Sequence, residues 1–179
     1  MDNYKEHFLL DTESVKKYVI DKLGYFKSSD EIEASEIGDG NINYVFKIWE
    51  PRTGKSIIVK QADKLLRSSG RPLDMYRSRI EAEVLKIQNR LSPEFVPEVY
   101  FYDENMYALS MEDISDYKNL RTELMIGKSF DHLAENISTF LVDTLLPTTD
   151  LFLSRAEKKS NVKKFMNPEL CDISEDLVF

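Results

Sequence analysis

The sequence has 179 residues, which is enough for one domain or for one domain and part of a second. Its hydrophobic content of 42% is compatible with a packed core rather than with disorder. A formal net charge of −8 argues against a dedicated surface for nucleic acid or for an anionic membrane, because either would need a basic patch. We therefore expect neither a nucleic acid nor a membrane as a partner.

The single cysteine, Cys171, excludes a disulfide within this chain and suits a reducing cytosol, so we expect a cytoplasmic protein. No histidine lies close to it in sequence, and thiolate chemistry needs an activating neighbour. We therefore interpret Cys171 as a buried small hydrophobic residue. The first seven residues lack the apolar centre of a signal peptide, and no apolar run approaches the ~20 residues of a membrane span.

Hydrophobic spacing and turn residues predict an alternation of helices and strands. Asp11 and Thr12 are expected to cap the first helix and Gly24 to end it, whereas Asp74 and Asp131 are expected to cap two later helices. We expect the predicted strand at residues 96–102 to be buried on both faces, since apolar and polar residues alternate poorly along it. The predicted helices cover residues 11–23, 74–91, 131–146 and 155–166, and the predicted strands cover 32–37, 43–49, 56–62, 96–102 and 106–111.

A glycine turn joins the first two predicted strands, and a lysine lies near the end of the third. Gly38 and Gly40 bracket this turn, where the backbone needs a positive φ or a close approach by a ligand. Backbone N–H groups in such a turn face an anion, and Lys60 can reach the same anion. Protein kinases hold ATP with this arrangement. An ordinary hairpin turn with Lys60 as a solvated strand end is the alternative, and Asn43 stands where G-x-G-x-x-G has its third glycine.

Two carboxylates flank the apolar stripe of the second predicted helix. Glu81 and Glu83 both lie at the edge of this stripe, so periodicity does not choose between them as a partner for Lys60. Two unit charges ~4 Å apart at an effective dielectric constant of ~20 attract by about 4 kcal/mol before desolvation, which is enough to fix a side chain. The stripe consists of Ile80, Val84, Ile87 and Leu91.

Four stretches in the same order resemble the 5-methylthioribose kinase family, which has the kinase-like fold of aminoglycoside and choline phosphotransferases. They are Gly38 to Phe46, Arg79 to Glu81, Met111 to Ser115, and Asn167 to Ile173. The resemblance implies an α+β, protein-kinase-like fold. Residues 1–113 would form an N-terminal lobe with an antiparallel five-stranded sheet, helices, the glycine loop and a hinge, and residues 114–179 would begin an incomplete helical C-terminal lobe. The implied ATP-binding residues are Gly38, Asp39, Gly40, Asn41, Lys60, Met111, Glu112 and Asp113, with Glu81 favoured as the residue that orients Lys60.

The resemblance further implies ATP and Mg²⁺ as cofactors, transfer of the γ-phosphate to the 1-hydroxyl of 5-methylthioribose in methionine salvage, and a homodimer. The family carries its catalytic and metal-binding carboxylates on a His-Gly-Asp loop and a later Asp-x-Glu motif. Neither His7 nor His132 is followed by Gly-Asp, and no Asp-x-Glu follows Asp113. We therefore expect the metal ligands and the catalytic aspartate outside these residues, and no activity from this chain alone.

Two alternatives remain at this point. A kinase of another small alcohol, such as choline, homoserine or an aminoglycoside, would have the same fold. A non-catalytic nucleotide-binding or interaction module would instead offer exposed apolar residues to a partner, and Phe165, Leu177 and Phe179 are the candidates.

Overall fold

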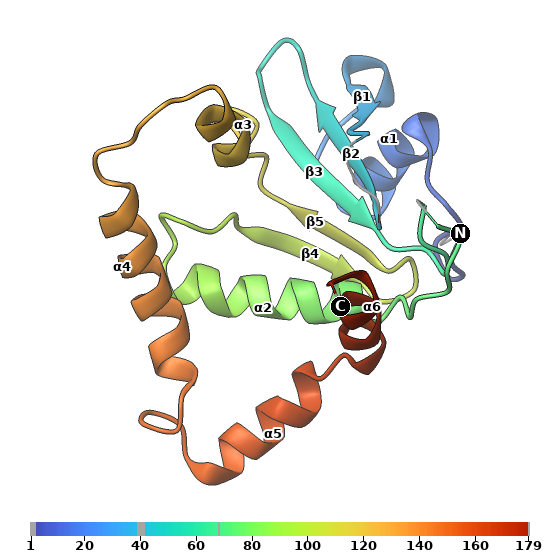
Figure 1. Ribbon diagram of the computed structural model, residues 1–179. Coiled ribbons are helices and arrows are strands. Elements are labelled where there is room, and N and C mark those ends of the chain that lie inside the picture. Colours follow the sequence, from blue (N-terminus) through green and yellow to red (C-terminus); the bar gives the residue numbers. More distant parts are fainter. Residues whose placement is uncertain (1–2, 39–41, 68, 179) are drawn as a thin grey trace. The chain divides into compact units, whose positions relative to one another are not determined.

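The computed structural model describes residues 3–38, 42–67 and 69–178, without the side chains of residues 177 and 178. It has the predicted α+β class, with a five-stranded antiparallel sheet and helices (Figure 1). The chain divides into two compact units. The first contains Met1–Val84, Val99–Asp113 and Asn167–Phe179, and the second contains Leu85–Glu98 and Ile114–Met166. The predicted domain boundary after residue 113 stays a prediction.

The sheet belongs to the first unit, and its strands lie within a few residues of the predicted ones. Its order is β1-β2-β3-β5-β4, and every neighbouring pair is antiparallel. The central strand, β3, therefore has partners on both sides. The strands are β1 (Glu33–Glu36), β2 (Tyr44–Trp49), β3 (Ser56–Gln61), β4 (Val99–Asp103) and β5 (Ala108–Met111).

One face of the sheet packs on the first helix, α1 (Thr12–Asp21). Successive strand residues point to opposite faces, so Phe46 and Ile48 on β2 share a face with Ile57 and Val59 on β3. All four are at most 1% exposed, and they form the main core of the protein. The helix contributes its buried stripe to the same core, namely Val15, Tyr18 and Val19.

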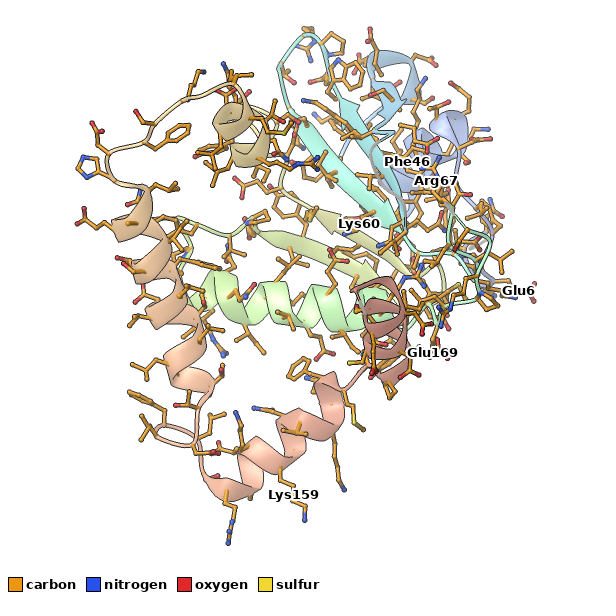
Figure 2. The ribbon with its side chains drawn as sticks, in the orientation of Figure 1. Glu6, Phe46, Lys60, Arg67, Lys159 and Glu169 are labelled. Carbon is orange, nitrogen blue, oxygen red and sulfur yellow. The ribbon has the colours of Figure 1, made fainter. Side chains whose placement is uncertain are left out.

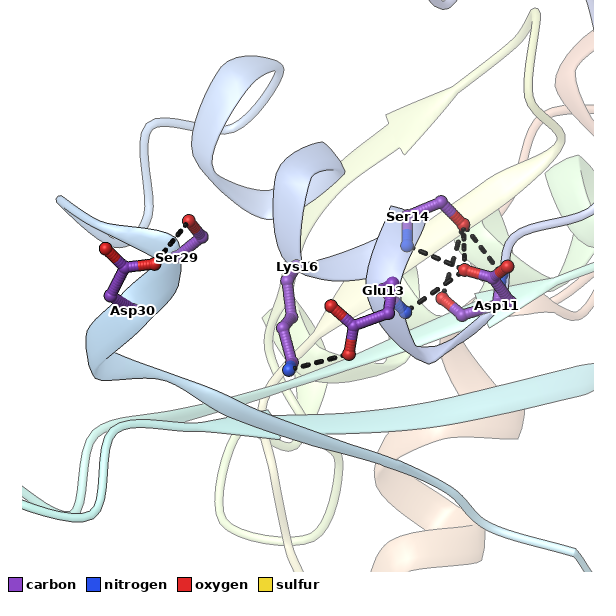
Figure 3. A network of polar contacts seen from close by, with 6 residues as sticks. All are labelled: Asp11, Glu13, Ser14, Lys16, Ser29 and Asp30. Carbon is purple, nitrogen blue, oxygen red and sulfur yellow. Dashed lines mark hydrogen bonds and ion pairs between the residues drawn. The ribbon is translucent and has the colours of Figure 1, made fainter.

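The ends of α1 are those that the sequence predicts. The Asp11 carboxylate accepts hydrogen bonds from the backbone N–H groups of Glu13 and Ser14, and the Ser14 hydroxyl accepts one from the Asp11 N–H (Figure 3). This reciprocal capping box satisfies N–H groups that have no partner within the helix. After the helix, Gly24 has a φ of +59°, a conformation that favours glycine.

Two predicted caps are wrong. The helix α2 begins at Arg77 rather than after Asp74 (Arg77–Leu91), because the Asp74 carboxylate accepts from the Tyr76 N–H in a local turn. The helix α4 (Leu133–Leu145) has His132 at its N-cap position, with no side-chain hydrogen bond to the helix. Asp131 is therefore not its cap.

The strand β4 corrects a second expectation, because it is not buried on both faces. Tyr100 and Phe101 are 40% and 37% exposed. The strand lies at the edge of the sheet, beside β5 only. An edge strand has one neighbour, so its apolar residues reach solvent more readily than those of β3.

The helix α6 (Pro168–Val178) packs in the first unit beside the loop that follows β3. Ile173 forms a small apolar cluster with Leu66 and Leu73. Cys171 lies two residues from Ile173, about 200° around the helix, and it is exposed. Our interpretation of Cys171 as a buried residue is therefore wrong.

The second unit contains α3 (Leu120–Met125), α4 and α5 (Arg155–Phe165). The aromatic rings of Phe95 and Phe140 contact each other within this unit, with their centroids 6.3 Å apart.

Across the described residues, no helix has both the length and the apolar character to span a membrane. Of the three residues proposed for a partner surface, Phe165 is partly exposed, whereas the Leu177 side chain and Phe179 lie outside the described part.

Candidate functional site

The face of the sheet opposite α1 carries a row of side chains that runs across four strands. Lys60 on β3 pairs in register with Val45 on β2 and with Leu109 on β5, and Leu109 pairs with Tyr102 on β4. Residues paired in antiparallel register point to the same face. Since Lys60 alternates with Val59, this row lies on the side away from the α1 core.

The first turns of α2 contact this row at two places. The Glu81 Oε1 lies 2.5 Å from the Lys60 Nζ, and the Ser78 hydroxyl lies 3.0 Å from the Tyr102 hydroxyl. Ser78 and Glu81 are three residues apart and therefore share a helix face. Figure 2 labels Lys60 on β3. The sheet register and the helix spacing thus bring the lysine and the glutamate together without a special loop.

The structure also separates the two glutamates that periodicity left equivalent. Glu83 lies about 200° around the helix from Glu81. Its carboxylate accepts a hydrogen bond from the Arg79 Nε at 3.1 Å, one helical turn away. Glu81 is therefore the carboxylate that contacts Lys60, and Glu83 belongs to an ion pair within the helix.

The Lys60–Glu81 pair orients a side chain more than it stabilises the fold. The two side chains are 26% and 32% exposed, so water screens their attraction. Ion pairs with such exposure contribute about 0–1 kcal/mol to stability. The contact at 2.5 Å nevertheless holds the ammonium group over the row on the face of the sheet opposite α1.

The glycine turn begins one strand away from Lys60. The Ile37 N–H donates to the Val45 carbonyl at 2.7 Å and closes the strand pair immediately before Gly38. Val45 is the residue directly opposite Lys60, and neighbouring strands are ~4.8 Å apart. Of the four predicted residues of the turn, Gly38 lies within the described residues, and Asp39, Gly40 and Asn41 lie outside them.

The predicted hinge residues lie at the end of β5, the strand that pairs with β3 and therefore neighbours Lys60. Met111 pairs with Ile58 on β3, two residues before Lys60. The carboxylate of Asp113 lies 2.8 Å from the Lys47 Nζ and is 5% exposed. Its charge is therefore balanced by Lys47, which ties the segment after β5 to β2, and the exposed Glu112 lies between Met111 and Asp113.

Sequence reasoning missed one residue of this region, Arg77. It is 7% exposed, although arginine is rarely buried unless it is paired. Burial lowers the pKa of its guanidinium, and the nearby Asp63 and Asp74 carboxylates oppose that shift. No periodic pattern marks this residue, and the asparagine at the third-glycine position, Asn43, is the one sequence signal that could have led to it. The Arg77 guanidinium donates to the backbone carbonyls of Ile42, Asp63, Leu73 and Asp74 and to the side chain of Asn43.

The described residues offer no metal centre. Among them, no group of three or more His, Cys, Asp or Glu side chains is placed to hold an ion. Mg²⁺ prefers several oxygen ligands, so these residues do not fit it as a resident metal.

The fold and the pair define a class of protein. A five-stranded antiparallel sheet, with a lysine on its central strand that contacts a glutamate of the following helix, is the N-terminal lobe of a kinase-like fold. No model of a known protein family matches the chain. Individual curated proteins do match it, among them several that are named methylthioribose kinase.

The methylthioribose kinase of Bacillus pumilus (strain SAFR-032) is 40% identical to the chain over 170 residues, which are 94% of this chain and 43% of that protein. The one of Bacillus cereus (strain ZK / E33L) is 42% identical over 158 residues, or 87% of this chain and 40% of that protein. The one of Enterobacter sp. (strain 638) is 39% identical over 158 residues, which are again 87% of this chain and 40% of that protein. The chain thus resembles methylthioribose kinases and spans about two fifths of their length.

Proposed function

We propose that this chain is the nucleotide-binding part of an ATP-dependent kinase that phosphorylates the 1-hydroxyl of 5-methylthioribose in methionine salvage. The observation that carries this proposal is the 2.5 Å contact between Lys60 and Glu81 beside a glycine turn. The names of the relatives, at about 40% identity over most of the chain, support methylthioribose over choline, homoserine or an aminoglycoside as the substrate.

Each part of the site has a task in this proposal. Lys60 binds the α- and β-phosphates of ATP, and Glu81 holds its ammonium group in place. The backbone N–H groups of Gly38, Asp39, Gly40 and Asn41 face the phosphates, as turns of this kind do with anions. The main chain of Met111, Glu112 and Asp113 bonds the adenine edge. A strand lysine and the glycine turn then fix the triphosphate from two sides, which is positioning rather than covalent chemistry.

Phosphate transfer also needs the carboxylates that the family carries on its His-Gly-Asp loop and Asp-x-Glu motif. The residues after Asp113 contain neither motif. A carboxylate must orient the attacking hydroxyl, and Mg²⁺, when it is bound, neutralises charge on the phosphates. The sequence has no His-Gly-Asp, so we propose that these 179 residues transfer no phosphate by themselves. We further propose that the complete enzyme is cytoplasmic and forms a homodimer. Sedimentation of the complete protein would test the homodimer.

Titration of the chain with the non-hydrolysable analogue AMP-PNP and Mg²⁺ tests the proposal. Lys60→Ala removes the phosphate contact and should weaken binding by about tenfold or more, the loss expected for a hydrogen bond to a charged group. Lys55→Ala is the matched control, because Lys55 contacts the Tyr25 ring away from this face. Equal affinities of the Lys60→Ala variant and the unaltered chain would refute a kinase-like site. Clear ADP formation from ATP, Mg²⁺ and methylthioribose would refute the proposed inactivity.

A further inference from the structure

Arg77 joins three segments that each end beside the candidate site. Its Nη2 donates to the Asn43 Oδ1 at 3.0 Å and to the Asp63 carbonyl at 3.0 Å. Its Nη1 donates to the carbonyls of Leu73 at 3.0 Å and Asp74 at 2.9 Å. A planar guanidinium with several N–H donors in fixed directions suits such a junction.

The three segments are those that carry the elements of the site. Asn43 lies between the glycine turn and β2. Asp63 follows the end of β3 by two residues and Lys60 by three. Arg77 is the first residue of α2, one helical turn before Glu81. One buried side chain therefore contacts the exit of the turn, the segment that follows the strand of the lysine and the residues just before the helix of the glutamate.

We propose that Arg77 is a positioning residue of the nucleotide site, which acts through Asn43 to hold the segment between the glycine turn and β2 in a fixed place relative to the Lys60–Glu81 pair. The expected effect on nucleotide binding rests on the proposed function. The connection between Arg77 and Asn43 rests on the observed contacts alone. It also explains the departure from the three-glycine pattern. Asn43, which is 7% exposed, replaces the third glycine because its side chain is the acceptor of this connection.

The alternative is that Arg77 only fills a buried space at the start of α2. The two roles differ at Asn43, because a space-filling role needs volume there and a positioning role needs an acceptor. Asn43→Leu keeps similar volume without an acceptor, and Asn43→Asp keeps the acceptor and adds charge. Arg77→Lys keeps the charge but lacks the planar fork. Arg79→Lys is the matched control, since Arg79 is a more exposed arginine on the same helix that pairs with Glu83.

Two measurements on the 179-residue chain decide between these roles. Amide hydrogen exchange without nucleotide should become at least about fivefold faster at residues 44–46 and 77–81 in Asn43→Leu and Arg77→Lys. In the same two variants AMP-PNP should bind about tenfold more weakly, as after loss of a hydrogen bond to a charged group. Asn43→Asp and Arg79→Lys should stay within about threefold of the unaltered chain in both measurements, which is less than one such bond contributes.

The outcomes separate the two proposals. Unchanged exchange in Asn43→Leu, or equal losses in Asn43→Leu and Asn43→Asp, would overturn the positioning role whatever the nucleotide result. If the unaltered chain does not bind AMP-PNP, the proposed function falls, and the exchange data alone decide whether Arg77 connects the turn to the helix.

Discussion

At the scale of single residues, the site depends on alternation along β3. Val59 and Gln61 face the core, and Lys60 between them faces the side of the sheet opposite α1. The sequence predicts Lys60 as a candidate because it ends an apolar strand. Helix periodicity alone could not choose between Glu81 and Glu83, because that choice depends on which helix face meets the sheet, and only the resemblance favoured Glu81. The structure makes the choice through the Ser78–Tyr102 and Lys60–Glu81 contacts.

Gln61 shows how the residue next to Lys60 is held. Its side chain is fully buried, donates to the carbonyls of Phe8 and Met106, and accepts from the Leu10 N–H. Gln61→Met keeps the length but leaves these buried groups without partners, each at about 1–3 kcal/mol. We expect the free energy of unfolding in urea to fall by about 3 kcal/mol or more.

Gln88→Met is the control for this substitution, because Gln88 is a partly exposed residue of α2, and it should change stability by less than about 0.5 kcal/mol. A loss below about 1 kcal/mol in Gln61→Met would mean that the buried hydrogen bonds do not hold the N-terminal segment to β3.

At the scale of elements, the sequence predicted the positions of helices and strands, because short-range contacts determine them. Glycine and proline positions and the spacing of apolar residues gave all five strands and four of the helices within a few residues. The exposure of β4 was not predictable, because it depends on the order of strands in the sheet. The contacts of Arg77 were not predictable either, since its partners lie 3 to 35 residues away in sequence.

The α1 cap gives a prediction about pH. Hydrogen bonds from Ser14, first from its N–H, lower the pKa of Asp11 in the folded chain. The charged carboxylate therefore favours the fold above its unfolded pKa of about 3.9, and this contribution is lost as the pH falls through the lower folded pKa. Asp11→Ala should lower the melting temperature at pH 7, and its difference from the unaltered chain should shrink below about pH 4.

Asp11→Asn separates the charge from the cap, since asparagine is also a good N-cap residue. Its advantage over Asp11→Ala should not depend on pH. Melting curves from pH 7 to pH 3 test both statements. A gap between Asp11→Ala and the unaltered chain that stays constant over this range would contradict the assigned role of the carboxylate.

At the scale of the whole molecule, one face of the sheet packs on the main core and the other carries the candidate site. The face toward α1 holds the main apolar core, and the other face holds Lys60, Lys47 and their acidic partners. The resemblance to methylthioribose kinases covers 94% of the chain, so it includes both faces and the second unit. The sequence could suggest this class from the glycine turn and Lys60 and favoured Glu81 through the resemblance, whereas the geometry of the Lys60–Glu81 contact required the fold.

The central claim is that Lys60 binds the phosphates of ATP, and an acyl-phosphate derivative of ATP tests it most directly. The amine of a lysine at the phosphates attacks the acyl carbon and forms an amide, the acyl–phosphate bond breaks, and ATP leaves while the amine proton goes to solvent. Peptide mass spectrometry should find the acyl group on Lys60, with labelling suppressed by excess ATP and with Lys55 unlabelled as the internal control. Labelling of Lys60 that ATP does not suppress, or labelling of Lys55 to the same extent, would contradict the account.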